Sequence, residues 1–233
     1  MTENVITGIG LYVGDGLTSI RQESSRGRVI FANSELRLID FFVQTVLKSC
    51  LATPKKELFI YAYSQNTNKI DNIFLQEKFL IKSSQIKIYS EGPKRPNYKI
   101  GTNNTVRRIV LDLLIRKAKE LCLENKKFAK AYLKGILLAE GNIYYNPETY
   151  QRFVAIQLAN KEEINFIKNL LKMLGIRRKI YKNVRGHYVI NIGYRKGLEI
   201  LRDLKIFSLV KEKQKLLENM CSSYTSKRSR WWK

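Results

Sequence analysis

Two acidic residues, Asp15 and Glu140, end chain segments that share one pattern. The first segment is Gly8–Gly16 (GIGLYVGDG) and the second is Leu133–Gly141 (LKGILLAEG). Each closes with a small residue, an acid and a glycine, which is typical of a helix that ends at the glycine. The helix dipole is negative at that end and favours a cation, so the two carboxylates together predict a metal site.

Two small residues lie four positions apart just before each acid, Gly10 and Gly14 in the first copy and Gly135 and Ala139 in the second. On a helix this spacing places both residues on one face. Small residues at this spacing let two helices approach closely. We therefore expect these four residues to form a helix interface that brings the two acids side by side.

The chain is strongly basic, with 43 Lys and Arg residues against 20 Asp and Glu and a formal net charge of +23. Such an excess points to a polyanionic partner, most often DNA or RNA, because phosphate binding releases counterions. The alternative is a ribosome-associated or simply basic soluble protein. A carboxylate metal site in so basic a chain predicts cleavage of a nucleic-acid backbone.

Other kinds of site find little support. With one histidine, His187, and three scattered cysteines, the chain offers neither a zinc site nor a Ser-His-Asp triad. The glycines of the first segment are similar to a dinucleotide fingerprint, but no buried strand clearly precedes them and the second copy lacks them. No apolar run reaches transmembrane length, so we expect a soluble protein of the cytoplasm with no membrane partner.

The order of elements after the first acid recurs after the second. An extended run at Arg28–Ala32 precedes Asn33, which opens a helix, and an extended run at Gln151–Leu158 precedes Asn160, which opens another. Asparagine is a favourable N-cap because its side-chain oxygen accepts from the first free N–H groups of a helix. The distance from the acid to this asparagine is 18 residues in the first copy and 20 in the second.

Further elements complete each half. The first half predicts a strand at Glu57–Ser64, an inserted helix at Lys69–Ile81, a hairpin of Gln85–Tyr89 and Asn97–Thr102, and a helix at Thr105–Glu124; the second predicts a hairpin of Ile176–Tyr181 and His187–Ile192 followed by two helices. The fold class is α+β, with pseudo-twofold duplicated αββαββα units and two antiparallel sheets. We expect domains at 1–124 and 125–221 and a basic tail at 222–233.

Basic and polar residues of the strands and turns are the candidates for contact with nucleic acid. Alternation along Ile176–Tyr181 places Arg177, Lys179 and Tyr181 on one face. The full set of candidates is Arg21, Arg26, Arg28, Lys87, Arg95, Lys99, Arg152, Gln157, Arg177, Lys179, Tyr181, Arg185, His187 and Asn191.

The repeat with its two acid-ending helices closely resembles the LAGLIDADG homing endonucleases, in their monomeric two-repeat, archaeal-type form. The second motif, Tyr132–Asn142 (YLKGILLAEGN), carries most of this resemblance, and the stretch Asn103–Leu114 (NNTVRRIVLDLL) resembles the end of a first repeat. The resemblance covers nearly the whole chain. It implies that the two sheets form a saddle along the major groove of DNA.

The family's mechanism implies roles for particular residues. Asp15 and Glu140 would hold divalent ions, Mg²⁺ or Mn²⁺, with help from the main-chain oxygens of Gly14 and Ala139. The segment Val210–Gln214 resembles the one that carries a basic residue near the site, which makes Lys211 the candidate. These metals would activate water and stabilise the leaving oxygen at each scissile phosphate.

One departure from the family concerns the ends of two strands. Members often carry Gln or Lys just before the residue that caps the next helix, whereas this chain has Ala32 and Ala159, followed by Asn33 and Asn160. The two asparagines either line the pocket in place of those residues or serve only as helix caps.

These observations predict a site-specific, double-strand DNA endonuclease that acts as a monomer on a long asymmetric site. The expected location is the prokaryotic cytoplasm, in association with the nucleoid. The alternative is a non-cleaving DNA-binding regulator or an RNA-splicing maturase built on the same scaffold.

Overall fold

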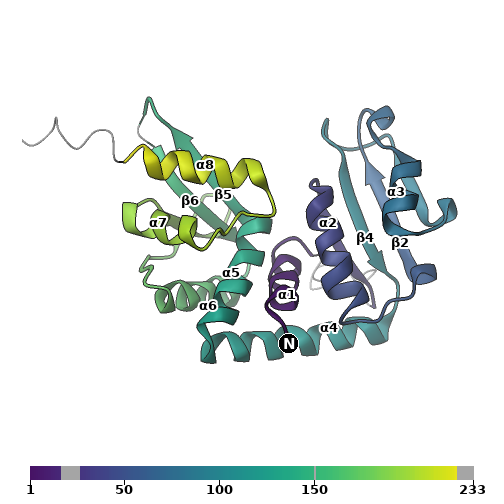
Figure 1. The fold of residues 1–233 in the computed structure, drawn as a ribbon, viewed down its shortest axis with the longest axis horizontal. Coiled ribbons are helices and arrows are strands. Elements are labelled where there is room, and N and C mark those ends of the chain that lie inside the picture. The colour runs from purple at the N-terminus through teal and green to yellow at the C-terminus, as the bar shows by residue number, and fades with distance from the viewer. Residues whose placement is uncertain (17–26, 150, 225–233) are drawn as a thin grey trace, which may run out of the picture. The chain divides into compact units, whose positions relative to one another are not determined.

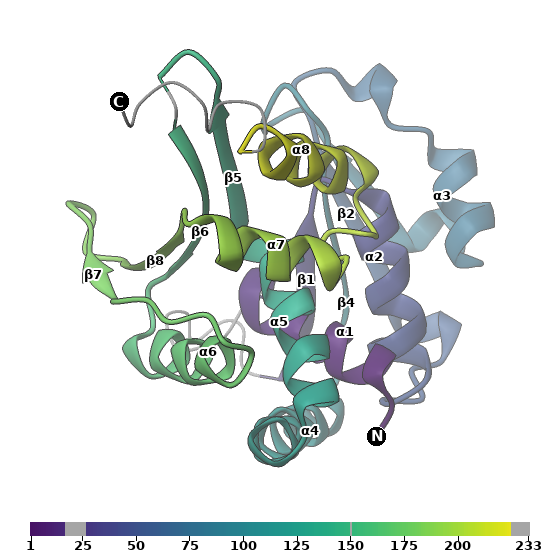
Figure 2. The same cartoon turned by 60° about the vertical axis from the view of Figure 1, so that its left-hand side comes forward.

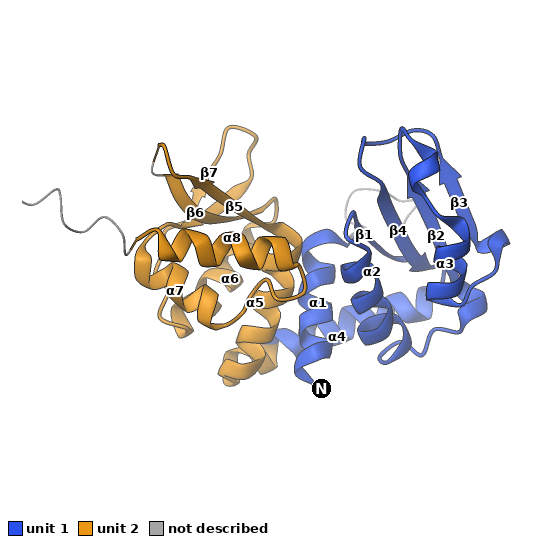
Figure 3. Ribbon diagram, turned by 45° about the horizontal axis from the view of Figure 1, so that its top comes forward, with its two compact units in different colours: residues 1–119 blue, residues 120–233 orange. Residues whose placement is uncertain are grey.

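The structure is a computed structural model of the 233-residue chain and describes residues 1–16, 27–149 and 151–224. The chain divides into two compact units, residues 1–119 and 120–233 (Figure 3). The boundary lies inside a helix, a few residues before the boundary expected at 124/125. No helix in the described part of the chain has the length and apolar content needed to cross a membrane.

Unit 1 begins with the helix that carries the first acidic motif. Its main elements are α1 (Glu3–Asp15), β1 (Val29–Asn33), α2 (Leu36–Phe42), the π-helix η2 (Val43–Lys48), β2 (Leu58–Tyr63), α3 (Asn72–Phe79), β3 (Ile86–Tyr89), β4 (Asn97–Thr102) and α4 (Thr105–Glu124) (Figure 1). The inserted helix and the long helix after the last strand are present as predicted.

The sheet of unit 1 has the strand order β1-β4-β2-β3. Strand β4 pairs with β1 and β2 in antiparallel fashion, whereas β2 and β3 are parallel. The predicted hairpin of β3 and β4 is therefore wrong. Because α3 lies between β2 and β3, the chain returns to the end where it started, which makes β3 parallel to β2 and leaves β4 to fill the place between β1 and β2.

The core of unit 1 lies between this sheet and α1 and α2. The ring of Tyr12 stacks on Phe42, and Phe42 also packs on Phe31 of β1. Gly8 faces η2 so closely that a Cβ atom there would overlap the hydroxyl of Thr45. The helix expected from Asn33 onward is thus an α-helix that widens into a π-helix where α1 packs against it.

Unit 2 repeats this beginning and then differs. Its elements are α5 (Lys126–Glu140), β5 (Gly141–Asn146), β6 (Gln151–Leu158), α6 (Lys161–Met173), β7 (Tyr181–Lys182), β8 (Tyr188–Ile192), α7 (Arg195–Asp203) and α8 (Lys211–Ser222) (Figure 2). The sheet is antiparallel throughout, in the order β5-β6-β8-β7. Of the strand predicted at Ile176–Tyr181, only Tyr181 belongs to a strand, the two-residue β7.

In unit 2 the helices lie against one side of the sheet (Figure 3). The side chains of Val154, Ile156 and Ile190 on the strands are buried, and so are those of Ile164 and Ile167 on α6. Alternation along the strands leaves the other side of the sheet to polar residues. The α+β class predicted from the sequence is confirmed.

Candidate functional site

Each of the two acidic motifs ends its helix in the same way. Helix α1 ends at Asp15 and α5 at Glu140, and the glycine that follows donates its N–H to the carbonyl four residues back, 2.7 Å from N to O for Gly16 and Tyr12. Both glycines are extended, with φ of −73° and −76°, so neither is needed for a left-handed turn. A Cβ atom at either position would overlap the same carbonyl oxygen, which explains why a glycine follows each acid.

The carboxylate of Asp15 is held by Asn33. The side-chain amide Nδ2 of Asn33 donates to Asp15 Oδ2 at 2.5 Å, and Asn33 Oδ1 accepts from the N–H of Glu35 at 2.8 Å. Asn33 is therefore more than a helix cap, because its amide nitrogen contacts the acid while its oxygen accepts from Glu35, the residue just before α2.

Asn160 has a different role. Its Oδ1 accepts from the N–H groups of Glu162 and Glu163 at 2.8 and 3.2 Å, as the N-cap of α6. The backbone pairing shows why the two asparagines are not counterparts. Gly16 bridges to Phe31 and Gly141 pairs with Ile156, so the two copies correspond at an offset of 125 residues. At this offset Asn160 corresponds to Glu35, the N-cap of α2.

The same offset of 125 residues changes which residues correspond at the ends of the two strands. Ala32 corresponds to Gln157 and not to Ala159, so a glutamine is present at this position in the second copy. The side chain of Gln157 is half-buried and its Nε2 lies 2.6 Å from Nδ1 of His187. Adding the offset of 125 residues to Ala32 identifies Gln157, whereas aligning the two copies on Asn33 and Asn160 does not.

The lysine beside the second acidic motif is Lys213. Its Nζ donates to the carbonyl oxygen of Gly141 at 2.9 Å. Lys211, the sequence candidate, is the exposed first residue of α8. Two positions along a helix turn a side chain by about 200°, so the two lysines point to different sides of α8. The predicted segment Val210–Gln214 thus contains a lysine that contacts the second motif, but this lysine is Lys213 and not Lys211.

The residues at the helix ends suit a hard divalent cation. Such ions prefer carboxylate and carbonyl oxygens, and the carbonyls of Gly14 and Ala139 lie in last turns, where no donor within the helix is available. In the described ranges no group of three or more His, Cys, Asp or Glu side chains could hold a metal ion. A cation at either helix end would therefore need further oxygen ligands to complete its coordination.

The exposed side of the unit 1 sheet carries lysines and tyrosines. Lys99 pairs in register with Ala32 and Tyr61, and Lys87 pairs with Tyr61 on the other side, so these four side chains cross the sheet on one face. The neighbouring row, Phe31, Ile100, Ile60 and Ile86, is buried. Lys87 and Lys99 thus share the polar face, as expected of candidates for nucleic-acid contact.

Aromatic contacts order this polar face. The Nζ of Lys99 lies 4.6 Å from the ring centroid of Tyr63, and the rings of Tyr63 and Tyr89 stack at 4.9 Å. Of the remaining candidates, Arg28 is exposed, and Arg95 pairs with Glu35 at 2.5 Å, which offsets part of its charge. Arg21 and Arg26 lie outside the described residues.

The polar side of the unit 2 sheet carries a basic cavity of about 590 Å³. It is lined by Arg177, Arg178, Lys179, Tyr181 and Asn191. Arg177, Lys179 and Tyr181 are exposed as the predicted alternation requires. Arg178, which the alternation would place on the opposite face, lines the same cavity because the segment before β7 is not a strand.

Three further candidates lie at different places in unit 2. Arg185 is exposed in the turn between β7 and β8, and His187, just before β8 begins, contacts Gln157. Arg152 is on the opposite face of β6 from Gln157, because their positions differ in parity, and its guanidinium lies 4.8 Å from the ring centroid of Tyr224. Arg152, a candidate for contact with nucleic acid, therefore does not share the polar face of β6 with Gln157.

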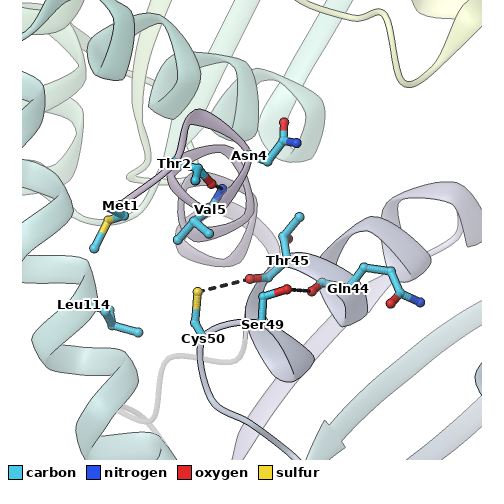
Figure 4. Close-up of a pocket in the computed structure, with 9 residues that line it drawn as sticks. All are labelled: Met1, Thr2, Asn4, Val5, Gln44, Thr45, Ser49, Cys50 and Leu114. Carbon is cyan, nitrogen blue, oxygen red and sulfur yellow. Dashed lines mark hydrogen bonds between the residues drawn. The ribbon is translucent and has the colours of Figure 1, made fainter.

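Another cavity, of about 640 Å³, lies in unit 1 beside the start of α1 and has a mostly apolar lining (Figure 4). The thiol of Cys50 donates to the carbonyl of Thr45, and the hydroxyl of Ser49 donates to that of Gln44. Burial also raises the pKa of the Cys50 thiol. These two side chains already have hydrogen-bond partners within the protein, and none of the described residues that line the cavity is a predicted site residue.

The sequence analysis missed the buried tyrosines of the two motif helices. The hydroxyl of Tyr12 accepts from Arg108 Nη1 at 2.7 Å, and burial raises the pKa of Tyr12 to about 12. The hydroxyl of Tyr132 donates to Oε1 of the buried Glu163 at 2.9 Å, and burial together with that carboxylate raises the pKa of Tyr132 well above its usual value. Both tyrosines are part of the buried packing that holds α1 and α5, the helices that end at the two acids, in place.

Comparison with known proteins gives a family match in unit 2 and a match of fold over the chain. Residues 127–206 match the model of the LAGLIDADG-like domain. No curated protein matches the chain in sequence. Among solved structures, mesophilic variants of the homing endonuclease I-DmoI are 18% identical, with 88% of this chain and 96% of that chain covered and a TM-score of 0.50.

Two more solved structures are similar in fold. An I-DmoI variant bound to its target DNA, nicked in the coding strand, in the presence of manganese is 19% identical, with 89% of this chain and 98% of that chain covered and a TM-score of 0.50. The N-terminal LAGLIDADG domain of DUF199/WhiA is 14% identical, with 92% and 87% covered and a TM-score of 0.53. Residues 127–206 thus form a LAGLIDADG-like domain, and the chain has the fold of the LAGLIDADG homing endonucleases.

Proposed function

We propose that this protein is a site-specific, divalent-metal-dependent endonuclease that cuts both strands of DNA. The observation that carries the proposal is that both motif helices end at an acid in the same capped geometry, one of these acids being held by Asn33. A structural protein needs no acid at these two positions, since a helix C-terminus disfavours negative charge. The acids are therefore best explained by a cation that they hold.

In the proposed site each carboxylate acts as a metal ligand, and other residues position it. Asn33 fixes the orientation of Asp15 through its N–H donor, and Lys213 places a positive charge beside the carbonyl that follows Glu140. A bound Mg²⁺ or Mn²⁺ would lower the pKa of a water molecule and stabilise the leaving oxygen of the phosphodiester. The carbonyl oxygens of Gly14 and Ala139 suit such ions.

The polar sheet faces supply the proposed DNA contacts. The net charge of +23 favours a polyanion, and the DNA complex of the similar I-DmoI variant supports duplex DNA as that polyanion. Lys87 and Lys99 in unit 1 and the basic cavity in unit 2 are placed for contact with phosphates and bases. Because the two faces differ in sequence, one chain acting as a monomer would recognise an asymmetric site.

A second candidate function is DNA binding without cleavage. It is favoured by one observation, that Ala32 is present where the second copy has Gln157, so the two copies are unequal beside their acids. The fold also occurs in the N-terminal domain of DUF199/WhiA, which is described as a LAGLIDADG domain and is not called an endonuclease. No comparison favours RNA, and we do not propose it.

The test is cleavage of a plasmid library that carries random inserts, by the full chain, first in Mg²⁺ and then in Ca²⁺. We expect linear product in Mg²⁺ with ends at one recurring sequence, and binding without cutting in Ca²⁺. The variants Asp15→Asn and Glu140→Gln are expected to bind that sequence and leave it uncut. Lys211→Ala is the matched control for Lys213→Ala, since only Lys213 contacts the second motif. Tight, sequence-specific binding without cutting in either ion would instead support the second candidate.

A further inference from the structure

The basic cavity of unit 2 differs from an ordinary phosphate site in one respect. Three of the five described residues that line it are cations, and none of the five is an acid. Its remaining polar lining includes the amide of Asn191, whose Oδ1 is buried and accepts no hydrogen bond from any described residue. Phosphate oxygens are only acceptors, so they can satisfy the arginines and lysine but never this oxygen. The cavity therefore suits a ligand that offers a donor as well as acceptors.

Asn191 lies on β8, on the polar side of the sheet. It pairs in register with Ala155 of β6, whose side chain is too short to reach over the amide. A strand also holds its side chains more rigidly than a loop does, which fixes the direction of the amide relative to the sheet. A buried amide oxygen that is left unpaired costs stability, and a ligand with a matching donor removes that cost.

Arg178 is the most rigidly held of the three cations. Its guanidinium lies 4.2 Å from the ring centroid of Tyr194, and its Nε is buried with no hydrogen-bond partner in the described part of the chain. Arg177 and Lys179 on either side of it are exposed. The cavity thus contains one amide and has positive charge along its rim. The positive rim suits phosphates, whereas the amide oxygen needs a hydrogen-bond donor, which a phosphate does not offer.

We propose that Asn191 recognises an adenine through the major groove, while Arg177, Arg178 and Lys179 hold the neighbouring phosphates. An asparagine amide matches adenine in two hydrogen bonds, since its oxygen accepts from N6 and its nitrogen donates to N7. This inference rests on the proposed DNA function and adds to it one residue that determines specificity. Asn191 discriminates among sequences, and the three cations act on every sequence alike.

The experiment selects duplexes from a randomised library with the full chain in Ca²⁺, followed by sequencing and by binding measurements on the selected duplex. For the unaltered protein, replacing the recognised A·T pair is expected to weaken binding about 10- to 100-fold. For Asn191→Ala the same replacement is expected to change binding less than about twofold, with every other position of the consensus kept. Asn191→Asp, which keeps the size of the side chain but loses the donor, is expected to lose the adenine preference as well.

Two controls separate this proposal from general effects. Asn169→Ala, on the exposed side of α6, is expected to leave the whole consensus unchanged, and Lys179→Ala to weaken all duplexes equally and to lower the salt dependence by about one phosphate contact. A consensus that Asn191→Ala leaves intact at every position, or a lost preference for G·C, overturns the assignment while the endonuclease proposal stands. A library from which the unaltered protein selects nothing overturns both.

Discussion

The contact between Asn33 and Asp15 makes a quantitative prediction that needs no knowledge of the DNA target. The two side chains are joined by one hydrogen bond of 2.5 Å from an amide to a carboxylate, and both residues are half-buried. Hydrogen bonds to charged groups contribute about 1.5 to 3 kcal/mol, and partial exposure lowers this to about 1 to 2 kcal/mol. We expect a coupling free energy of this size between the two residues.

A double-mutant cycle measures this coupling. Asn33→Ala removes the donor to Asp15 and also the acceptor for the N–H of Glu35, and the second loss adds about 1 kcal/mol. This second loss is present with or without Asp15, so it cancels when Asn33→Ala, Asp15→Ala and the double variant are compared by urea unfolding. The remaining difference is the energy of the contact alone.

A capping control completes the design. Asn160→Ala loses two capping hydrogen bonds of α6, so we expect it to lower stability by about 1 kcal/mol. Asn160 is a suitable control because its structural counterpart in unit 1 is Glu35 and not Asn33. Paired with Asp15→Ala, it should show no coupling above the experimental error. A coupling below about 0.5 kcal/mol for Asn33 and Asp15 would refute the view that Asn33 holds the acid.

Three further predictions follow from the helices that carry the acids. Because burial raises the pKa of Tyr12 to about 12, this tyrosine stays protonated in the folded state after it ionises in the unfolded state. Its contribution to the free energy of unfolding should therefore fall by about 2 kcal/mol between pH 10 and 12. Tyr132, whose pKa is also raised, adds a fall of its own, so the total fall measured by urea unfolding should be smaller in Tyr12→Phe by about 2 kcal/mol. Tyr132→Phe removes the donor to the buried Glu163 and should cost about 1 to 3 kcal/mol in the same assay, and an unchanged midpoint would contradict the contact. Gly16→Ala and Gly141→Ala place a Cβ atom on a helix carbonyl and should each cost about 1 to 3 kcal/mol, as thermal unfolding can check, although neither glycine has a positive φ.

The sequence was sufficient for those elements whose signals are local. Small residues, an acid and a glycine predicted the ends of α1 and α5, and the extended run predicted at Gln151–Leu158 is β6 with the same bounds. It was not sufficient for the pairing of β3 and β4, because the order of strands in a sheet depends on the crossover through α3 and not on the turn between them.

Within the candidate site the errors came from matching residue types. Asn33 and Asn160 look alike in sequence, but only strand pairing shows that the counterpart of Asn160 is Glu35. Lys211 and Lys213 belong to one basic segment, and only the direction of each side chain on α8 separates them. The unpaired oxygen of Asn191 is likewise a consequence of what surrounds it, which no single-residue pattern contains.

The most direct test of the proposed function is a crystal structure of the full chain with its selected DNA duplex and Ca²⁺. We predict an oxygen of Asp15 and an oxygen of Glu140 within about 2.3 to 2.6 Å of bound calcium ions that also contact phosphodiester oxygens. Calcium bound to DNA without either carboxylate, or carboxylates turned away from the scissile phosphates, would contradict it.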